Sequence, residues 1–90
     1  MYQLEQTVKF KKDIKLAKKR GLDIRLLDEV VTHLVEKGKL SQKNKPHKLT
    51  GKYKGFWECH IQPDWLLVWK QDDTIRLITL TRTGTHSDLF

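Results

Sequence analysis

FWECHIQPDWLLVWK, residues 56–70, is the stretch that decides the fold. It consists of two apolar runs on either side of Pro63-Asp64, a pair that is typical of tight turns. So short a connection joins antiparallel neighbours. A third run follows a second turn, at Asp72-Asp73. The sequence therefore predicts a meander of antiparallel strands at residues 53–61, 65–70 and 75–82.

Side chains alternate between the two sides of a strand, and this rule separates core from surface in the predicted meander. In the first strand Trp57, Cys59 and Ile61 lie on one side, which is the better core, and His60 lies on the other side with Glu58. The last strand alternates less clearly, and its pattern does not decide which side is buried. Alternation places four residues on one side of this last strand: Arg76, Ile78, Leu80 and Arg82.

Two amphipathic helices precede the meander. The first begins after Thr7, carries apolar residues at helical spacing and ends at Gly21. The second begins after Asp23 and ends at Gly38. Thr and Asp are common N-cap residues, and glycine commonly ends a helix. Because only a few residues join the two helices, we expect an antiparallel helical hairpin.

These elements define an α+β fold class. A short alternating run at residues 2–6 indicates an opening strand. We therefore expect a small antiparallel β-sheet, made of this N-terminal strand and the three-strand meander, with the N-terminal two-helix hairpin packed on one face. Ninety residues suffice for one core only, so residues 1–90 are expected to form a single domain.

The chain is strongly basic. Its formal net charge is +7 at pH 7, and residues 1–45 hold twelve Lys and Arg against six acidic residues. Charge alone leaves the polyanionic partner open between nucleic acid, an acidic protein and an anionic membrane. No apolar run approaches the roughly 20 residues that span a bilayer, so no membrane partner is expected. A single cysteine, Cys59, and an N-terminus without a signal-peptide pattern favour a reduced, cytoplasmic protein.

The polar residues with catalytic chemistry lie mostly outside the predicted helices. Five of them lie in three separate parts of the chain: His47 in a lysine-rich loop, His60 and Asp64 at a strand end and a turn, and Arg82 and His86 at and beyond the end of the last strand. Neighbouring strands are about 5 Å apart, so these groups can converge. Together they suit cleavage of a phosphodiester, which needs a base, an acid and a cation for the charge that develops on phosphorus.

The same side chains also allow metal-binding or purely structural roles. Three histidines and an aspartate could ligate zinc, although their spacings match no compact ligand motif. Arg82 could form a structural ion pair with Asp64 or Glu58. The tryptophans, Trp65 among them, are more often core residues than platforms for stacked bases.

The sequence also resembles a known toxin family. The specific motifs are Pro63-Asp64-Trp65 and Arg82-Thr83-Gly84-Thr85-His86, with further similar runs at residues 13–20, 47–51 and 66–70 and at Leu89-Phe90. Through them the chain resembles the YafQ branch of the RelE/ParE toxin superfamily over essentially its whole length. The family fold is a small antiparallel sheet that carries two N-terminal helices, in agreement with the fold expected from the sequence pattern.

The resemblance implies a function. It implies a bacterial type II toxin, a ribosome-dependent mRNA endoribonuclease that cleaves mRNA in the A site of the 70S ribosome and inhibits translation. It implies a cognate antitoxin protein as partner, and we expect no cofactor and no metal. The helical hairpin and its lysine-rich surface are suited to an acidic amphipathic segment of such a partner.

The family's functional positions also have counterparts here: His47, His60, Asp64, Trp65, Arg82, His86 and Phe90. We expect metal-independent transesterification, in which the RNA 2′-OH attacks the adjacent phosphorus. His86 is the expected general acid, and Arg82 is the expected clamp on the charged transition state. The general base stays open among three residues: His47, His60 and Asp64.

Substrate contacts are expected from aromatic rings and from lysines. Gly84 is expected to let the backbone turn, so that the segment after it folds back over the sheet. Phe90 and Trp65 are candidates to position a base by stacking. Lys48 and Lys52 are candidates to bind the RNA backbone.

Two alternative functions stay open. A ParE-like toxin would use the same fold to inhibit a topoisomerase by binding, and it would not cleave RNA. A non-catalytic RNA-binding module would use the basic helices alone and would tolerate loss of every histidine. Cleavage of message on translating ribosomes separates these possibilities.

Overall fold

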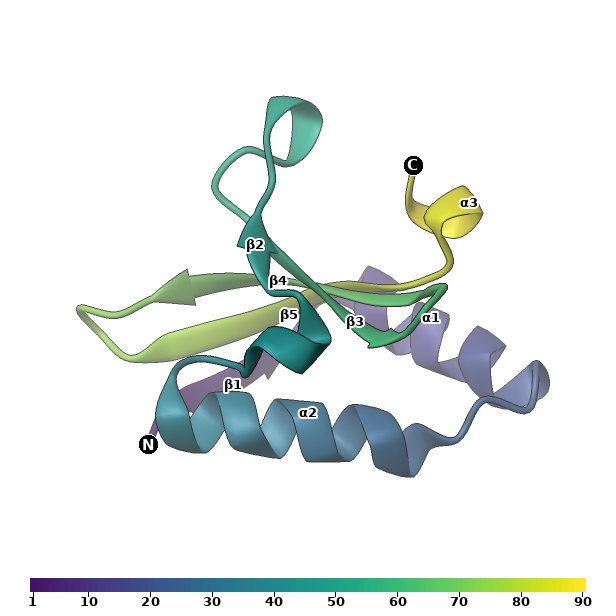
Figure 1. The fold of residues 1–90 in the computed structure, drawn as a ribbon, viewed down its shortest axis with the longest axis horizontal. Coiled ribbons are helices and arrows are strands. Elements are labelled where there is room, and N and C mark those ends of the chain that lie inside the picture. Colours follow the sequence, from purple (N-terminus) through teal and green to yellow (C-terminus); the bar gives the residue numbers. More distant parts are fainter.

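The computed structural model describes residues 1–90 as a mixed sheet with helices on both of its faces (Figure 1). Its elements follow the chain in this order: β1 (Gln3–Gln6), α1 (Val8–Lys19), α2 (Ile24–Lys37), the 3₁₀-helix η1 (Gln42–Asn44), β2 (His47–Lys48), the 3₁₀-helix η2 (Gly51–Tyr53), β3 (Trp57–Gln62), β4 (Trp65–Asp72), β5 (Leu77–Gly84) and α3 (His86–Leu89). The α+β class, the two helices and the meander are as predicted.

The sheet has five strands in the order β1-β5-β4-β3-β2. The meander β3-β4-β5 is antiparallel, but β1 pairs with β5 in parallel. The prediction of a wholly antiparallel sheet was therefore wrong at its first strand. Parallel neighbours require a long crossover, and here the two helices and the meander lie between β1 and β5 in sequence. The loop at residues 39–52 adds β2 as an edge strand on β3.

Local signals account for the two long helices. The hydroxyl of Thr7 accepts a hydrogen bond from the N–H of Phe10 at 3.0 Å, and the carboxylate of Asp23 accepts one from the N–H of Arg25 at 3.0 Å. Each bond satisfies an N–H that the helix itself leaves free. Gly38 ends α2 in the left-handed conformation, with φ 72°, which costs glycine little. The predicted N-caps and this helix end are confirmed.

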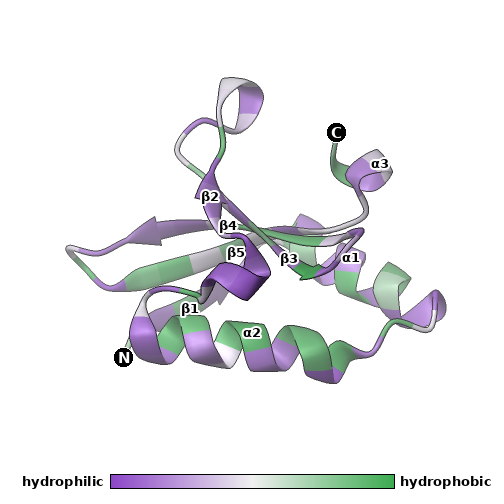
Figure 2. Cartoon of the chain, in the orientation of Figure 1, coloured by the Kyte–Doolittle hydropathy of each residue, from purple (hydrophilic) through white to green (hydrophobic).

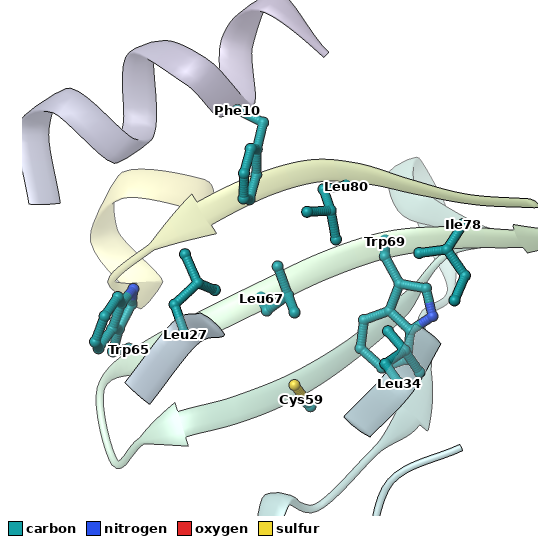
Figure 3. Close-up of a cluster of buried hydrophobic side chains, with 9 residues drawn as sticks. All are labelled: Phe10, Leu27, Leu34, Cys59, Trp65, Leu67, Trp69, Ile78 and Leu80. Carbon is teal, nitrogen blue, oxygen red and sulfur yellow. The ribbon is translucent and has the colours of Figure 1, made fainter. Parts of the chain in front are cut away.

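Both long helices lie on the same side of the sheet, which we call the helix face (Figure 1). In Figure 2 each of them carries hydrophobic and hydrophilic residues, as amphipathic helices do. The core between helices and sheet consists of nine buried residues (Figure 3): Phe10, Leu27, Leu34, Cys59, Trp65, Leu67, Trp69, Ile78 and Leu80. Trp57 and Ile61 pack against this cluster, so the predicted core side of β3 is confirmed.

Cys59 is a core residue without a disulfide partner. Burial raises the pKa of its thiol to about 12, with a smaller contribution from the nearby carboxylate of Glu58. The thiol is therefore protonated and unreactive at neutral pH. None of the helices has the length and apolar composition that crossing a membrane requires.

The opposite side of the sheet, which we call the α3 face, is covered by α3 and the loop around η2 (Figure 1). A second, smaller cluster lies there, formed by Leu66, Val68 and Leu89 and packed against Leu49, Tyr53 and Phe56. Residues 53–56 were predicted to begin a strand, and this was wrong. Gly55 has a φ of 92°, which interrupts the extended backbone, so β3 begins at Trp57.

A β-bulge in β5 changes the direction of one candidate site residue. Leu80 pairs with Trp69, whereas Arg82 pairs with Val68, so that Thr81 is an extra residue. Directly paired residues lie on the same face of a sheet, and Val68 faces α3. Arg82 therefore lies on the α3 face, and its predicted grouping with Leu80 and Ile78 was wrong. Alternation fails here because a bulge shifts the period by one residue.

Candidate active site

The C-terminal segment is held in place by hydrogen bonds. Thr85 and Asp88 form a capping box at the start of α3. The carboxylate of Asp88 also accepts two hydrogen bonds from the guanidinium of Arg20, at 2.5 and 3.1 Å, and this partner lowers the pKa of the Asp88 carboxyl. Gly84 makes room for Asp88, since a Cβ at Gly84 would lie 2.8 Å from Asp88 Oδ2. The segment predicted to fold back over the sheet does so.

His86 is held by Asp64. Its Nδ1 lies 2.8 Å from Asp64 Oδ1, and its backbone N–H donates to the same oxygen at 3.1 Å. These two hydrogen bonds from His86 lower the pKa of the Asp64 carboxyl. The carboxylate accepts a hydrogen bond from Nδ1–H, so Nε2 is directed away from Asp64 and stays free for chemistry.

His60 lies beside His86. The centroids of the two imidazole rings are 5.9 Å apart, and the rings are tilted by 56°. His60 Nδ1 lies 3.2 Å from the carbonyl oxygen of Pro63. A carbonyl can only accept, so we assign the proton to Nδ1, and the neutral ring then carries its lone pair on Nε2. The structure thus brings His60, Asp64 and His86 together.

His47 lies on the edge strand next to this group and has different partners. Its Nδ1 is 3.0 Å from the carbonyl oxygen of Lys45, and its Nε2 is 3.4 Å from Glu58 Oε1. Both nitrogens face acceptors, an arrangement that suits the imidazolium cation. Glu58 is a buried carboxylate and was not among the candidates from sequence. The only signal for it was its place two residues before His60, on the same side of the strand.

Arg82 is held by a carboxylate of α1. Its Nε lies 2.7 Å from Asp13 Oδ2, and its Nη2 lies 3.2 Å from Asp13 Oδ1. Hydrogen bonds to Asp13 are the main cause that raises the pKa of the Arg82 guanidinium, and Tyr53 contributes less. In the register of the sheet Arg82 is two strands away from Glu58, with Val68 between them. Arg82 therefore borders the site from β5.

The two aromatic candidates, Phe90 and Trp65, differ in exposure. Phe90 is 61% exposed on the α3 face, and its ring meets the edge of Tyr53 with centroids 5.4 Å apart. Trp65 is only 2% exposed, and its indole N–H donates to the Thr83 hydroxyl in the core. A buried ring offers no face to a base, so the expectation of stacking on Trp65 does not fit this structure. Trp65 belongs to the core between the helices and the sheet, which explains its burial.

The two candidate lysines lie on different faces. Lys52 Nζ is 5.9 Å from the ring centroid of Tyr53, beside Phe90. Lys48 pairs across the strands with Trp57, which packs in the helix-face core, and its Nζ is 5.6 Å from the Trp57 ring. Lys48 therefore points away from the histidines, and a contact from it to RNA beside them does not fit this structure.

A groove of about 710 Å³ lies beside the histidines, between α2, η1 and the turn after β3. His60 and Pro63, whose side chain and carbonyl form a hydrogen bond in the candidate site, also line this groove, and so does His33. His86 and Asp64 themselves are exposed, with 56% and 66% of their side-chain surfaces accessible. The candidate site is thus an open surface rather than an enclosed pocket.

Comparison with known proteins gives this fold and site a family. Residues 2–90 match the family described as "Bacterial toxin of type II toxin-antitoxin system, YafQ". A relative, the mRNA interferase toxin YafQ of Escherichia coli strain K12, is 39% identical over 88 residues, which cover 97% of this chain and 94% of the relative. Sequence and fold define a bacterial toxin of a type II toxin–antitoxin system. Within that class, the chain belongs to the YafQ family.

Solved structures agree with this assignment. The toxin in the crystal structure of the E. coli DinJ-YafQ complex has 37% sequence identity and a TM-score of 0.90, and the match covers 100% of this chain and 99% of that one. A metal-bound toxin from Helicobacter pylori has 42% identity and a TM-score of 0.90, with complete coverage of both chains. In the present structure no three His, Cys, Asp or Glu side chains are grouped so that they could hold a metal ion.

Proposed function

We propose that this toxin is an endoribonuclease that cleaves mRNA by transesterification. The observation that carries the proposal is the pair His60 and His86, whose ring centroids are 5.9 Å apart and whose Nδ1 atoms are each held by an oxygen acceptor. Two oriented imidazoles with free Nε2 atoms are the groups that a base and an acid on one phosphate require. The name of the E. coli relative, mRNA interferase, supports the same substrate.

The surroundings of each imidazole support a different role for it in this proposal. A carboxylate, Asp64, lies against Nδ1 of His86 and stabilises the imidazolium, so His86 is the proton donor. His60 faces only the neutral carbonyl of Pro63 at this nitrogen, and its Nε2 carries the lone pair of a base. Of the three residues that the sequence left open as the base, His47, His60 and Asp64, we therefore propose His60.

The reaction balances without further reagents. His60 Nε2 takes the proton of the 2′-OH, and the 2′-oxygen forms a bond to the adjacent phosphorus. The bond from phosphorus to the 5′-oxygen of the next nucleotide breaks, and His86 Nε2 gives that oxygen a proton. The products are a 2′,3′-cyclic phosphate and a free 5′-OH, and the charge that develops on phosphorus needs a nearby cation.

Arg82 and His47 are the cations in this proposal. The Arg82 guanidinium lies on the α3 face with Nη1 outside its ion pair with Asp13. His47 lies between the carbonyl of Lys45 and the carboxylate of Glu58, and it adds a second positive charge when it is protonated. Phe90, exposed against Tyr53, supplies a ring on which a base can stack.

We further propose that the substrate is mRNA held in the A site of the ribosome. The exposed side chains of His86 and Asp64 do not enclose a nucleotide, so another body must orient the RNA for in-line attack. The net charge of +7 favours approach to ribosomal RNA. The protein would act in the cytoplasm, where ribosomes translate.

An antitoxin is the proposed protein partner. The E. coli relative was crystallised in a complex with DinJ. In this chain α1 presents exposed lysines to a partner, among them Lys15, Lys18 and Lys19. An acidic amphipathic segment fits that surface. If 1 M salt and charge reversal of these three lysines left the complex unchanged, the electrostatic part of this proposal would be wrong.

The reaction is tested on translating ribosomes that carry a defined mRNA. Mapping of the product ends should show a 2′,3′-cyclic phosphate and a 5′-OH, and a single 2′-deoxy substitution at the cleaved nucleotide should abolish cleavage there. His33→Gln is a comparison variant, because His33 lines the groove next to His60 but is not one of the two oriented imidazoles. Cleavage that persists at the 2′-deoxy position, or an intact message with wild-type toxin, would refute the proposal.

A further inference from the structure

Asp13 of α1 is an extensively bonded carboxylate next to the proposed site. It accepts three hydrogen bonds: from Arg82 Nε at 2.7 Å, from Arg82 Nη2 at 3.2 Å and from the backbone N–H of Thr83 at 3.1 Å. The side chains of Asp13 and Arg82 are only 13% and 20% exposed. The pair is thus shielded from water and fixed at both of its ends.

The sheet itself explains why a carboxylate of α1 is placed here. β1 pairs with β5 only over residues 77–80. Beyond Leu80 the outer edge of β5 has no neighbouring strand, and α1 lies along it instead. The Thr7 hydroxyl donates to the carbonyl of Thr81 at 2.8 Å, and Asp13 accepts the N–H of Thr83. A backbone N–H of the rigid sheet therefore fixes the carboxylate of Asp13.

Fixing Asp13 has a consequence for Arg82. The bulge at Thr81 turns Arg82 to the α3 face, and Asp13 then holds the guanidinium by two of its nitrogens. Only Nη1 is left without a partner in this ion pair. The planar guanidinium has a defined orientation when two of its N–H groups are bound to one carboxylate.

We propose that Asp13 is a positioning residue for the reaction: it holds Arg82 so that the remaining nitrogen, Nη1, meets the phosphate oxygen on which charge develops. This inference rests on the proposed function, because it gives Arg82 a phosphate to bind. A role of Asp13 in orienting Arg82 also has a different kinetic effect from a role through its negative charge alone. A carboxylate that acted only through its charge would weaken phosphate binding, and its removal would then lower KM and leave the rate unharmed.

The orientation can be observed without any cleavage assay. In ¹⁵N-labelled wild-type protein, the Nε–H of Arg82 and the amide of Thr83 should exchange slowly with solvent and give sharp signals. In Asp13→Ala both should exchange rapidly, whereas in Asp28→Ala, which removes an exposed aspartate of α2, they should be unchanged. Slow exchange of the Arg82 Nε–H in Asp13→Ala would overturn the inference, even if the protein proved not to cleave RNA.

Cleavage then tests the positioning role by a double-mutant cycle on ribosome-bound mRNA. Asp13→Ala should lower kcat by about 10- to 100-fold with little change in KM, since misplacing a group by an ångström costs rate rather than affinity. Asp13→Asn should keep part of the activity, because its amide oxygen still accepts N–H groups. In an Arg82→Ala background Asp13→Ala should have almost no further effect on cleavage. Equal losses in both backgrounds, with a matching fall in Tm, would show a structural role only.

Discussion

The two faces of the sheet are built differently. The helix face buries one continuous cluster of nine side chains under α1 and α2, whereas the apolar cluster of the α3 face has only three buried members, Leu66, Val68 and Leu89. On the α3 face the polar residues are held by hydrogen bonds and ion pairs instead, such as His86 to Asp64 and Arg82 to Asp13. The difference teaches that the helix face supplies most of the apolar burial, whereas the groups used by the proposed reaction lie on the α3 face.

The largest effect that this comparison predicts is on the α3 face. His86→Gln should lower cleavage by about 10² to 10⁴, the usual range for loss of a general acid or base. The glutamine amide can still donate to Asp64, so α3 should stay in place and the free energy of unfolding should change little. Single-turnover cleavage and urea unfolding of the same preparation check both parts. A large loss of stability would show that this face also carries the fold.

The reverse pattern is expected on the helix face. Leu67 is fully buried in the core, and Leu67→Ala should lower the free energy of unfolding by about 2–5 kcal/mol. The fraction that remains folded should cleave RNA at the wild-type rate, because Leu67 points away from the histidines. Urea unfolding and cleavage per folded molecule measure the two quantities. A variant that is folded but inactive would show that the core of the helix face also contributes to cleavage.

Phe90→Ala should have an intermediate effect. Loss of one stacked base typically costs about 1–3 kcal/mol, so cleavage should fall by about tenfold, mainly through KM. Phe90 is 61% exposed, so the melting temperature should hardly change. The matched variant is Leu89→Ala, which removes a buried residue of the small cluster and should lower stability. An unchanged KM in Phe90→Ala would show that this ring does not bind the substrate.

The anchoring of α3 should depend on pH. Arg20 holds the pKa of the Asp88 carboxyl below its usual value, so the carboxylate stabilises the folded state fully above the unfolded-state pKa of about 3.9. The contribution is lost as the pH falls through the lower folded-state pKa. Asp88→Asn should therefore lower the melting temperature slightly at pH 7, by about 2–5 °C. The difference from wild type should shrink below about pH 4, and a gap that widens there would contradict the ion pair.

The smallest effect distinguishes two lysines. Lys52 lies over Tyr53, the ring that contacts Phe90 on the α3 face, whereas Lys48 lies over Trp57 toward the helix face. Lys52→Ala should reduce the salt dependence of RNA binding by about 0.7 in the log–log slope, the value for one contact to a single-stranded phosphate. Lys48→Ala should leave that slope unchanged. Equal effects of the two variants would mean that the RNA reaches both faces.

The contrast between the faces also explains what the sequence could predict. The helix caps at Thr7 and Asp23 and the core side of β3 depend on neighbours in sequence, and both were predicted correctly. The parallel pairing of β1 with β5 and the bulge at Thr81 depend on contacts between distant segments, which no local pattern carries. For that reason the direction of Arg82 was missed.

The candidate site was predictable in its residue types but not in its pairings. His60, Asp64 and His86 were chosen for their chemistry, and the structure places them together. Asp13, the partner of Arg82, gave no sequence signal, and Glu58, the partner of His47, gave only its place on the His60 side of the strand, since one charged residue in a strand or on a helix is ordinary. Trp65 and Lys48 show the opposite case, in which a chemically suitable residue is buried or directed elsewhere.

The central claim, that His60 is the base and His86 the acid of one reaction, is tested most directly by the pH dependence of single-turnover cleavage. Wild-type toxin should give a bell-shaped profile, with a rising limb from the base and a falling limb from the acid. His60→Gln should lose the rising limb, and His86→Gln should lose the falling limb. A bell that persists in both variants, or limbs lost in the opposite order, would contradict the assignment.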